Sequence, residues 1–157
     1  MRSVLFVCTA NICRSPMASE IFKHKVSKLE NPAEWRIESA GTWAADGNPA
    51  VQNAQLTLAS LYKVDLSNHS SRVVSRKLLS SFNLILTMEK GHKEALQVEF
   101  PELAGRVYLL SEMVGEKREI HDPIGGTPFD FRDTARELDR ILTEGFDKIR
   151  QLAGSGP

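Results

Sequence analysis

The sequence VLFVCTANICRSP, from Val4 to Pro16, joins a buried strand to a helix and holds both cysteines of the chain. Ser3–Cys8 (SVLFVC) is a short continuous apolar run, which is typical of a strand covered on both faces. Pro16 suits a first helical position, and the apolar residues that follow it to Leu29 recur with the period of a helix. In a parallel sheet, ligands bind beyond the carboxyl ends of the strands. Cys8 lies at that end of this first strand.

The rest of the chain continues the alternation of strands and helices. Further strands are predicted at Trp35–Ala40, Leu84–Met88 and Val107–Leu110, and further helices at Pro49–Tyr62, His92–Phe100 and Asp130–Leu152. Glycine and proline mark loops at Gly41–Gly47 and Gly115–Phe129. The pattern predicts an α/β protein in three layers, a parallel sheet with helices on both faces. We expect one domain over residues 1–153 and a disordered tail over residues 154–157.

Composition narrows the class of function. The 157 residues include 20 basic and 20 acidic side chains, so the formal net charge is zero, which argues against nucleic acid or anionic lipid as a partner. The sequence has no apolar run of membrane-spanning length and no signal peptide, so we expect a cytoplasmic protein. The four histidines are scattered without metal-ligand spacing, and no metal or cofactor is expected.

The loop between the first strand and the first helix, Cys8–Ser15, has the chemistry of an anion site. Backbone N–H groups of such a loop can form a nest, and the helix adds its positive end. The guanidinium of Arg14 matches two oxygens of a phosphoryl group. The same positive field favours a nucleophilic thiolate at Cys8. Ser15 can donate a hydrogen bond to the Cys8 sulfur, and Asn11 tolerates the left-handed backbone that the loop needs.

Each of these residues also has a simpler interpretation. A single cysteine at a strand end is more often a small core residue, and an arginine in a first helical turn is more often a solvated charge. The combination of strand, C-x5-R-S and helix is much rarer than either part and favours phosphoryl chemistry. That chemistry needs a proton donor and then a base, and one carboxyl group can serve as both. Asp122 precedes Pro123 in a stiffened loop, although Asp-Pro alone is usually a turn.

The stretch VCTANICRSPMASEIF resembles the phosphate-binding loop of the low-molecular-weight protein tyrosine phosphatases, and the resemblance extends along nearly the whole chain. Matching segments are SAGTW at Ser39–Trp43, NHSSR at Asn68–Arg72, LILTM at Leu84–Met88 and HDP at His121–Pro123. The resemblance implies a flavodoxin-like phosphotyrosine phosphatase fold with a central four-stranded parallel sheet. It also implies a monomeric hydrolase that needs no cofactor, takes phosphotyrosine-containing proteins as substrates and releases inorganic phosphate.

The resemblance also assigns roles to residues. Cys8 would be the nucleophile, Arg14 the phosphate clamp, Ser15 the partner of the thiolate and Asp122 the general acid and base. The loop residues Thr9, Ala10, Asn11, Ile12 and Cys13 would bind phosphate and substrate, and His69 and Ser39 would support Asn11 from behind. His92 receives no role. Trp43 is either a core anchor or one wall of an aromatic slot. Cys13 is either a small packed residue or a resolving thiol that traps oxidised Cys8 as a disulfide.

The sequence contains opposing indications about the substrate, phosphotyrosine or phosphoarginine. Ile12 offers an apolar face that suits a phenyl ring. By resemblance, the related protein arginine phosphatases have Thr at the matching loop position, which suits a polar phosphoguanidinium group. The run Ile124-Gly125-Gly126 after Asp-Pro, in contrast, resembles the arginine phosphatases and lacks the aromatic pair found in many tyrosine phosphatases. We weight Ile12 more heavily because it lies in the loop that touches substrate. Arginine phosphatase is the first alternative. Two weaker alternatives are thiol-coupled arsenate reduction and a non-enzymatic phosphate-binding module. Arsenate reduction usually needs further cysteines downstream to relay the disulfide, and none follows Cys13.

Overall fold

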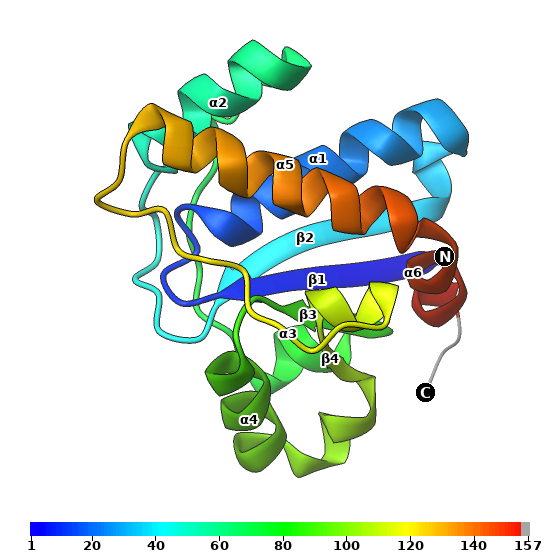
Figure 1. Ribbon diagram of the computed structural model, residues 1–157. Coiled ribbons are helices and arrows are strands. Elements are labelled where there is room, and N and C mark those ends of the chain that lie inside the picture. Colours follow the sequence, from blue (N-terminus) through cyan, green and yellow to red (C-terminus); the bar gives the residue numbers. More distant parts are fainter. Residues whose placement is uncertain (155–157) are drawn as a thin grey trace.

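A four-stranded parallel sheet forms the centre of the protein in the computed structural model, which describes residues 1–154. The strands are β1 (Arg2–Cys8), β2 (Trp35–Gly41), β3 (Leu84–Thr87) and β4 (Val107–Leu109), in the order β2-β1-β3-β4. The register pairs Cys8 with Gly41 and Val7 with Thr87, so the carboxyl ends of the strands meet at one edge of the sheet (Figure 1). The predicted parallel α/β fold is confirmed.

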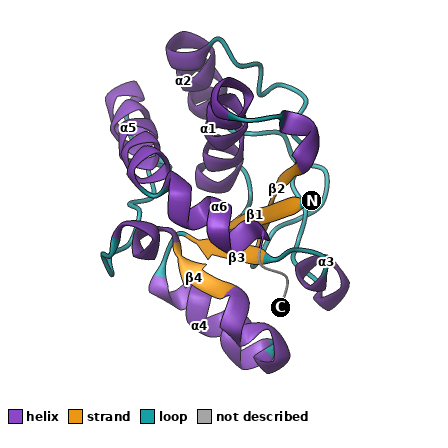
Figure 2. Cartoon of the chain, turned by 90° about the vertical axis from the view of Figure 1, so that its right-hand side faces the viewer, coloured by secondary structure: helices purple, strands orange, loops and turns teal. Residues whose placement is uncertain are grey.

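Helices cover both faces of this sheet, as Figure 2 shows. Along β1, Val4 and Phe6 belong to one apolar cluster and Leu5 and Val7 to another, because side chains of a strand alternate between faces. The first cluster includes residues of α1 (Arg14–Leu29), α2 (Gln52–Tyr62), α5 (Pro128–Glu144) and α6 (Phe146–Gly154). The second includes residues of α3 (Arg76–Ser80) and α4 (Lys90–Glu99). Burial on both faces explains why β1 is apolar without alternation.

The predicted helix Asp130–Leu152 is wrong as a single element, because two helices, α5 and α6, occupy this stretch. They meet at Gly145, where a Cβ would lie 2.8 Å from the Cβ of Met113 and 2.9 Å from the Ile141 carbonyl oxygen. Glycine allows this close approach of the backbone to the preceding segment. The apolar stripe runs through both helices, so periodicity alone does not reveal the break.

Other boundaries differ by a few residues from the prediction. The helix predicted from Pro49 begins at Gln52, because the Val51 N–H donates to the Ile12 carbonyl oxygen (2.9 Å) and ties the preceding segment to the loop that follows β1. The helix predicted from His92 begins at Lys90, because Glu89 caps it. At the C-terminus, Gly154 is the last residue of α6 rather than part of a tail, and residues 155–157 lie outside the described residues.

Several short elements were not predicted. They are α3 and the 3₁₀ helices η1 (Pro32–Glu34), η2 (Pro101–Arg106) and η3 (Leu110–Val114). Each has at most six residues, which is too short to show a helical period. No helix within residues 1–154 is long and apolar enough to cross a membrane.

Candidate active site

The loop Cys8–Ser15 is held at the carboxyl edge of the sheet through its own carbonyl oxygens. The Thr42 N–H donates to the Cys8 oxygen (2.9 Å), and the Trp43 N–H donates to the Thr9 oxygen (3.0 Å). Gly41 has to be small here, because a Cβ at this position would collide with the Thr9 carbonyl oxygen. A loop whose carbonyls are used in this way is the arrangement expected where its N–H groups serve an anion.

Asn11 organises the interior of this loop. Its backbone has φ 58°, the left-handed conformation that the sequence predicts. Its side-chain Nδ2 donates to Ser15 Oγ (2.8 Å) and Ser39 Oγ (2.9 Å), and its Oδ1 accepts from the Arg72 N–H (3.0 Å). His69 Nε2 lies 2.6 Å from the Asn11 carbonyl oxygen. The structure therefore brings His69 and Ser39 to Asn11, where the resemblance expects them.

Cys8 and Ser15, the two ends of the loop, are in contact with each other. Cys8 is 3% exposed, and its sulfur lies 3.0 Å from Ser15 Oγ. Ser15 Oγ accepts from Asn11 Nδ2, so its own hydrogen is directed either to the Ala40 carbonyl oxygen, 3.3 Å away, or to the Cys8 sulfur. A hydroxyl in this position can stabilise a thiolate and the departing sulfur of a phosphocysteine.

Arg14, the first residue of α1, is a buried cation that is 2% exposed. Its Nη1 donates to the Ile120 carbonyl oxygen (2.8 Å). Its Nη2 lies 2.7 Å from Glu89 Oε2 and 3.5 Å from Asp122 Oδ2. Two carboxylates and a carbonyl thus fix the guanidinium, which is the most buried of the charged groups paired at this edge.

Asp122 lies beside Arg14 on a loop that remains accessible, since its side chain is 43% exposed. Its Oδ1 accepts the Ile124 N–H at 3.1 Å, which orients the carboxyl group. The structure therefore places the predicted acid next to the predicted phosphate clamp, although 108 residues separate them in the sequence.

The second cysteine is a free thiol, as is the first. Burial raises the pKa of the Cys13 thiol to about 12, with the negative charges of Asp122 and Cys8 adding to the effect. Cys13 packs in the apolar cluster that covers one face of the sheet. Its role as a resolving thiol stays a prediction.

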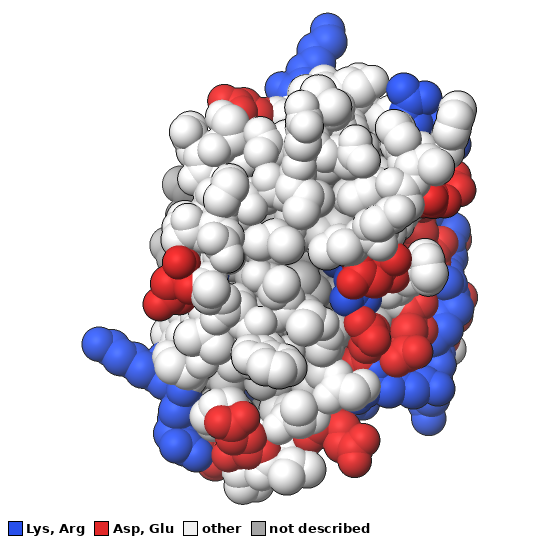
Figure 3. Space-filling view, turned by 90° about the vertical axis from the view of Figure 1, so that its left-hand side faces the viewer, with Lys and Arg blue, Asp and Glu red and all other residues white. Residues whose placement is uncertain are grey.

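Three apolar residues belong to the loop Cys8–Ser15 or to segments beside it. Trp43 is 86% exposed, so the interpretation of Trp43 as a core anchor is wrong. Ile124 is 50% exposed, and Ile12 is partly buried. Figure 3, which looks onto the side where the strands end, shows a face that is largely uncharged at its centre, with acidic and basic side chains around the margin and most densely on the right.

Sequence reasoning missed Glu89 and His92. Glu89 pairs with Arg14, and His92 Nε2 lies 2.8 Å from Thr9 Oγ1. Both residues follow β3, whose carboxyl end is at the same edge as Cys8. The rule that ligands bind at this edge could have indicated them. Among residues 1–154, no group of three or more His, Cys, Asp or Glu side chains is arranged to hold a metal ion.

The fold and this loop together define a parallel α/β protein with a thiol, a buried guanidinium and a hydroxyl in the loop at the carboxyl ends of its strands. The family model described as low molecular weight phosphotyrosine protein phosphatase matches residues 3–153. The chain belongs to this family, a family of hydrolases, and the predicted membership is confirmed.

Relatives of two activities resemble the chain. It is 38% identical over 121 residues to the low molecular weight protein-tyrosine-phosphatase Wzb of Escherichia coli, which covers 77% of each chain. It is 32% identical over 143 residues to a protein-arginine-phosphatase of Bacillus subtilis, covering 90% of this chain and 92% of the relative. A solved low molecular weight protein tyrosine phosphatase from T. tengcongensis superposes with a TM-score of 0.89 at 35% identity, covering 94% of this chain and 99% of that one.

Proposed function

We propose that the protein hydrolyses phosphotyrosine in proteins through a phosphocysteine intermediate, without a metal ion. The observation that carries the proposal is the convergence of Cys8, Ser15 and Arg14 at one loop, with Asp122 3.5 Å from the guanidinium. These contacts support a site in which Cys8 is the nucleophile, Arg14 the phosphate clamp and Asp122 the acid. The charge of that group would be met by Arg14 and by backbone N–H groups of the loop.

In the first step, the Cys8 thiolate attacks phosphorus. An S–P bond forms, the P–O bond to the tyrosine oxygen breaks, and Asp122 supplies a proton to that oxygen. Arg14 binds two of the remaining phosphoryl oxygens, and its contacts with Glu89 and Ile120 hold it in place as charge develops. A fixed cation needs no reorganisation during the reaction, which is the main benefit of this arrangement.

In the second step, water replaces the cysteine. Asp122, now a carboxylate, takes a proton from the water as its oxygen attacks phosphorus. The S–P bond breaks, the thiolate of Cys8 returns with Ser15 Oγ 3.0 Å from its sulfur, and inorganic phosphate leaves. The acid of the first step is thus the base of the second.

The substrate preference would depend on the residues around the loop. Ile12 presents an apolar side chain in the loop itself, and Trp43 and Ile124 are exposed apolar residues of neighbouring segments. A phenyl ring gains from such contacts, whereas a phosphoguanidinium group loses water without a new partner. These contacts favour phosphotyrosine.

Protein arginine phosphatase is the second candidate. The Bacillus subtilis relative matches 90% of this chain, more than the 77% matched by the Escherichia coli tyrosine phosphatase. The run Ile124-Gly125-Gly126 also resembles the arginine phosphatases. In this reaction the same Cys8, Arg14 and Asp122 would act, and only the leaving group would differ.

The test is a comparison of kcat/KM on a phosphotyrosine peptide and a phosphoarginine peptide, in excess chelator, with Cys8→Ser as the control. We expect a preference for phosphotyrosine that Cys8→Ser abolishes and that Ile12→Thr shifts toward phosphoarginine. Preference of the unchanged protein for phosphoarginine would establish the second candidate. Loss of activity in chelator would contradict the metal-independent mechanism. A single monomeric, cytoplasmic domain stays a prediction.

A further inference from the structure

His92 connects α4 to the phosphate-binding loop although the reaction gives it no part. The ring is buried. Its Nδ1 lies 3.1 Å from the backbone nitrogen of Glu89, and its Nε2 lies 2.8 Å from Thr9 Oγ1. Thr9 directly follows Cys8. One imidazole therefore contacts both the cap of α4 and the residue next to the predicted nucleophile.

The contacts of the ring define its tautomer. A backbone N–H can only donate, so Nδ1 accepts from Glu89 and carries no hydrogen. In the neutral ring the hydrogen is then on Nε2, and Nε2 donates to Thr9 Oγ1. Thr9 is exposed, so its own hydroxyl hydrogen remains available to a group that enters the pocket.

Glu89 completes the link from the other side. Its carboxylate accepts a hydrogen bond from the backbone N–H of His92, while the His92 ring accepts from the backbone N–H of Glu89. The two bonds form a reciprocal capping box at the start of α4. The same carboxylate lies 2.7 Å from Arg14 Nη2. The capping box of α4 therefore contacts the loop Cys8–Ser15 at two points, Thr9 and Arg14.

Four charged groups face the ring: Glu89 of the cap, Arg14 of α1, and Glu119 and Asp122 of the segment between η3 and α5. Glu89 Oε2 lies 3.7 Å from Nε2. Burial is the largest influence and lowers the pKa of His92 below its ordinary value of 6.5. The charge of Arg14 also lowers this pKa, and the three carboxylates raise it by less than the total lowering. The ring is therefore neutral at neutral pH.

We propose that His92 is a positioning residue for phosphate binding: the neutral ring holds the Thr9 hydroxyl and the Glu89–Arg14 pair in the geometry that receives a phosphoryl group. His92 acts through these residues and does not touch the reacting atoms. Protonation would place a hydrogen on Nδ1 against the Glu89 N–H and open the capping box. The inference rests on the proposed function in one respect, that the loop binds a phosphoryl group.

The sign of the pH dependence follows from the lowered pKa. A histidine that is harder to protonate in the folded protein contributes fully above its unfolded pKa, and the contribution disappears as pH falls through the folded value. Positioning by His92 is thus complete above pH 6.5 and is lost at some lower pH.

The experiment measures binding of inorganic phosphate by titration calorimetry in the Cys8→Ser background, so that it does not depend on turnover. The variants are Thr9→Val, His92→Ala and both together. We expect each single change to weaken phosphate binding about fivefold, the equivalent of one hydrogen bond. The double variant should be no weaker than the weaker single variant, because both remove the same contact. Effects that simply multiply would overturn the proposal.

His92→Gln is the conservative variant. One end of its amide accepts and the other donates, as the neutral ring does, so we expect it to recover most of the phosphate affinity lost in His92→Ala. Glutamine does not titrate, so the ratio of phosphate affinities of the unchanged protein and His92→Gln should be constant above pH 6.5 and fall in acid. This ratio cancels the titration of phosphate itself. A ratio independent of pH would overturn the proposal.

His24→Gln is the matched control, since His24 contacts Tyr62 and not the loop, with the two ring centres 5.6 Å apart. It should leave phosphate affinity unchanged. A purely structural His92 would lower the melting temperature of His92→Ala while phosphate affinity stayed the same, and that result would contradict the inference. If His92→Ala does not fold, Thr9→Val and the pH series of His92→Gln decide. Phosphate binding with the expected coupling, but no Cys8-dependent hydrolysis, would refute the proposed function and leave this inference standing.

Discussion

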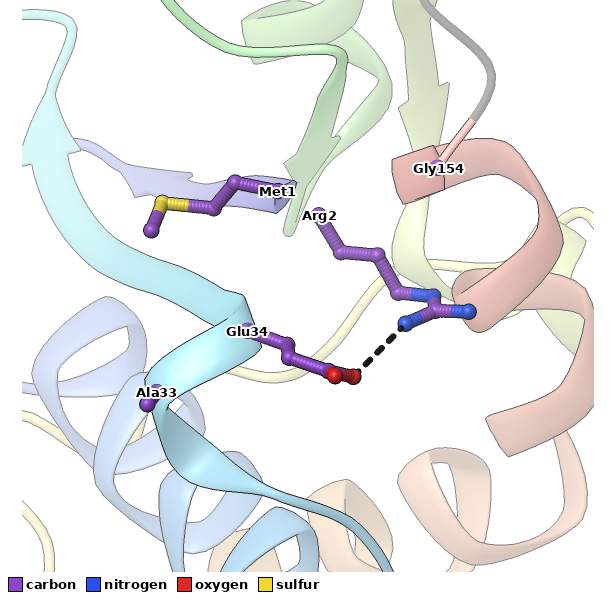
Figure 4. Close-up of a pocket in the computed structure, with 5 residues that line it drawn as sticks. All are labelled: Met1, Arg2, Ala33, Glu34 and Gly154. Carbon is purple, nitrogen blue, oxygen red and sulfur yellow. Dashed lines mark ion pairs between the residues drawn. The ribbon is translucent and has the colours of Figure 1, made fainter.

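An arginine paired with two carboxylates lies near each end of β1, Arg2 in the strand itself and Arg14 at the start of α1, yet the two guanidinium groups differ in their access to water. At the amino end, Arg2 lies 3.8 Å from Glu30 and 3.6 Å from Glu34, and the Glu34 side chain is 59% exposed. A cavity of about 630 Å³ opens beside them, lined by Met1, Arg2, Ala33, Glu34 and Gly154 (Figure 4). At the carboxyl end, Arg14 is 2% exposed and is also bonded to a carbonyl oxygen.

The comparison shows that volume is a poor guide to this molecule's chemistry. Two charges about 4 Å apart interact by roughly 1 kcal/mol in water and roughly 4 kcal/mol in a protein-like medium. The Arg2–Glu34 pair, with Glu34 largely exposed, is close to the first case, whereas the buried guanidinium of Arg14 is closer to the second. The amino end has space without a nucleophile among its lining residues, whereas the carboxyl end combines a thiol, a buried cation and an acid.

The largest predicted difference is between the two arginines themselves. Arg14→Met should lower kcat/KM for p-nitrophenyl phosphate about 10³-fold, because the phosphoryl charge loses its fixed partner. Arg2→Met, at the other end of the strand, should leave kcat/KM unchanged. Steady-state kinetics of both variants test this. A comparable loss in Arg2→Met would show that the comparison of the two ends is mistaken.

The carboxylates should differ in the same direction. Asp122→Asn removes the proton donor and should reduce kcat about 10²-fold for p-nitrophenyl phosphate, and further for phenyl phosphate, whose leaving oxygen needs the proton more. Glu34→Gln is the matched change at the amino end, with no effect expected on kcat and less than about 1 kcal/mol on stability. Equal losses of kcat on both substrates in Asp122→Asn would argue against Asp122 as the acid.

A third contrast concerns the two non-glycine residues within residues 1–154 that have left-handed backbone, Asn11 at φ 58° and Lys63 at φ 55°. Asn11→Ala removes three hydrogen bonds, one to Ser15 within the loop and two that tie the loop to Ser39 and Arg72, and should lower the free energy of unfolding by about 3 kcal/mol. Lys63 ends α2, and Lys63→Gly should raise the free energy of unfolding by up to about 1 kcal/mol, because glycine adopts this backbone without strain. Denaturant unfolding of both variants provides the check. Similar effects of the two changes would mean that the Asn11 side chain does not hold the loop.

The smallest effect is expected within the loop, at Cys13. With a pKa raised to about 12, this thiol stays protonated at neutral pH, so iodoacetamide at pH 7 should label Cys8 and spare Cys13. Cys13→Ala should change kcat/KM by less than about threefold, because the side chain packs in the apolar cluster. Peptide mapping after labelling, and after peroxide, separates packing from trapping. A Cys8–Cys13 disulfide after peroxide would support the resolving role.

Much of this protein follows from patterns that are local in the sequence. The run from Val4 to Cys8 is apolar at every position, and strand and helix follow each other closely enough that a parallel sheet is the expected arrangement. The loop from Cys8 to Ser15 brings thiol, guanidinium and hydroxyl together within eight residues. Neighbours in the chain have little freedom to lie apart, so these parts of the site were predictable.

Elements and contacts that depend on distant parts of the chain could not be predicted from the sequence. The break at Gly145 depends on the close approach of Met113, and the start of α2 depends on a hydrogen bond to Ile12, so the apolar period of neither segment reveals the boundary. Glu89 and His92 carry no recognisable motif. They come beside Arg14 and Thr9 only because β3 lies next to β1 in the sheet.

The chemical groups of the loop could be read from the residues alone, because covalent connection keeps Cys8, Arg14 and Ser15 within eight residues. Their surroundings depend on the folded chain: which carboxylates pair with Arg14, which ring contacts Thr9, and which arginine is removed from water. Those outcomes depend on strand order and helix packing, which sum weak preferences over the whole chain and are visible only once the sheet is assembled.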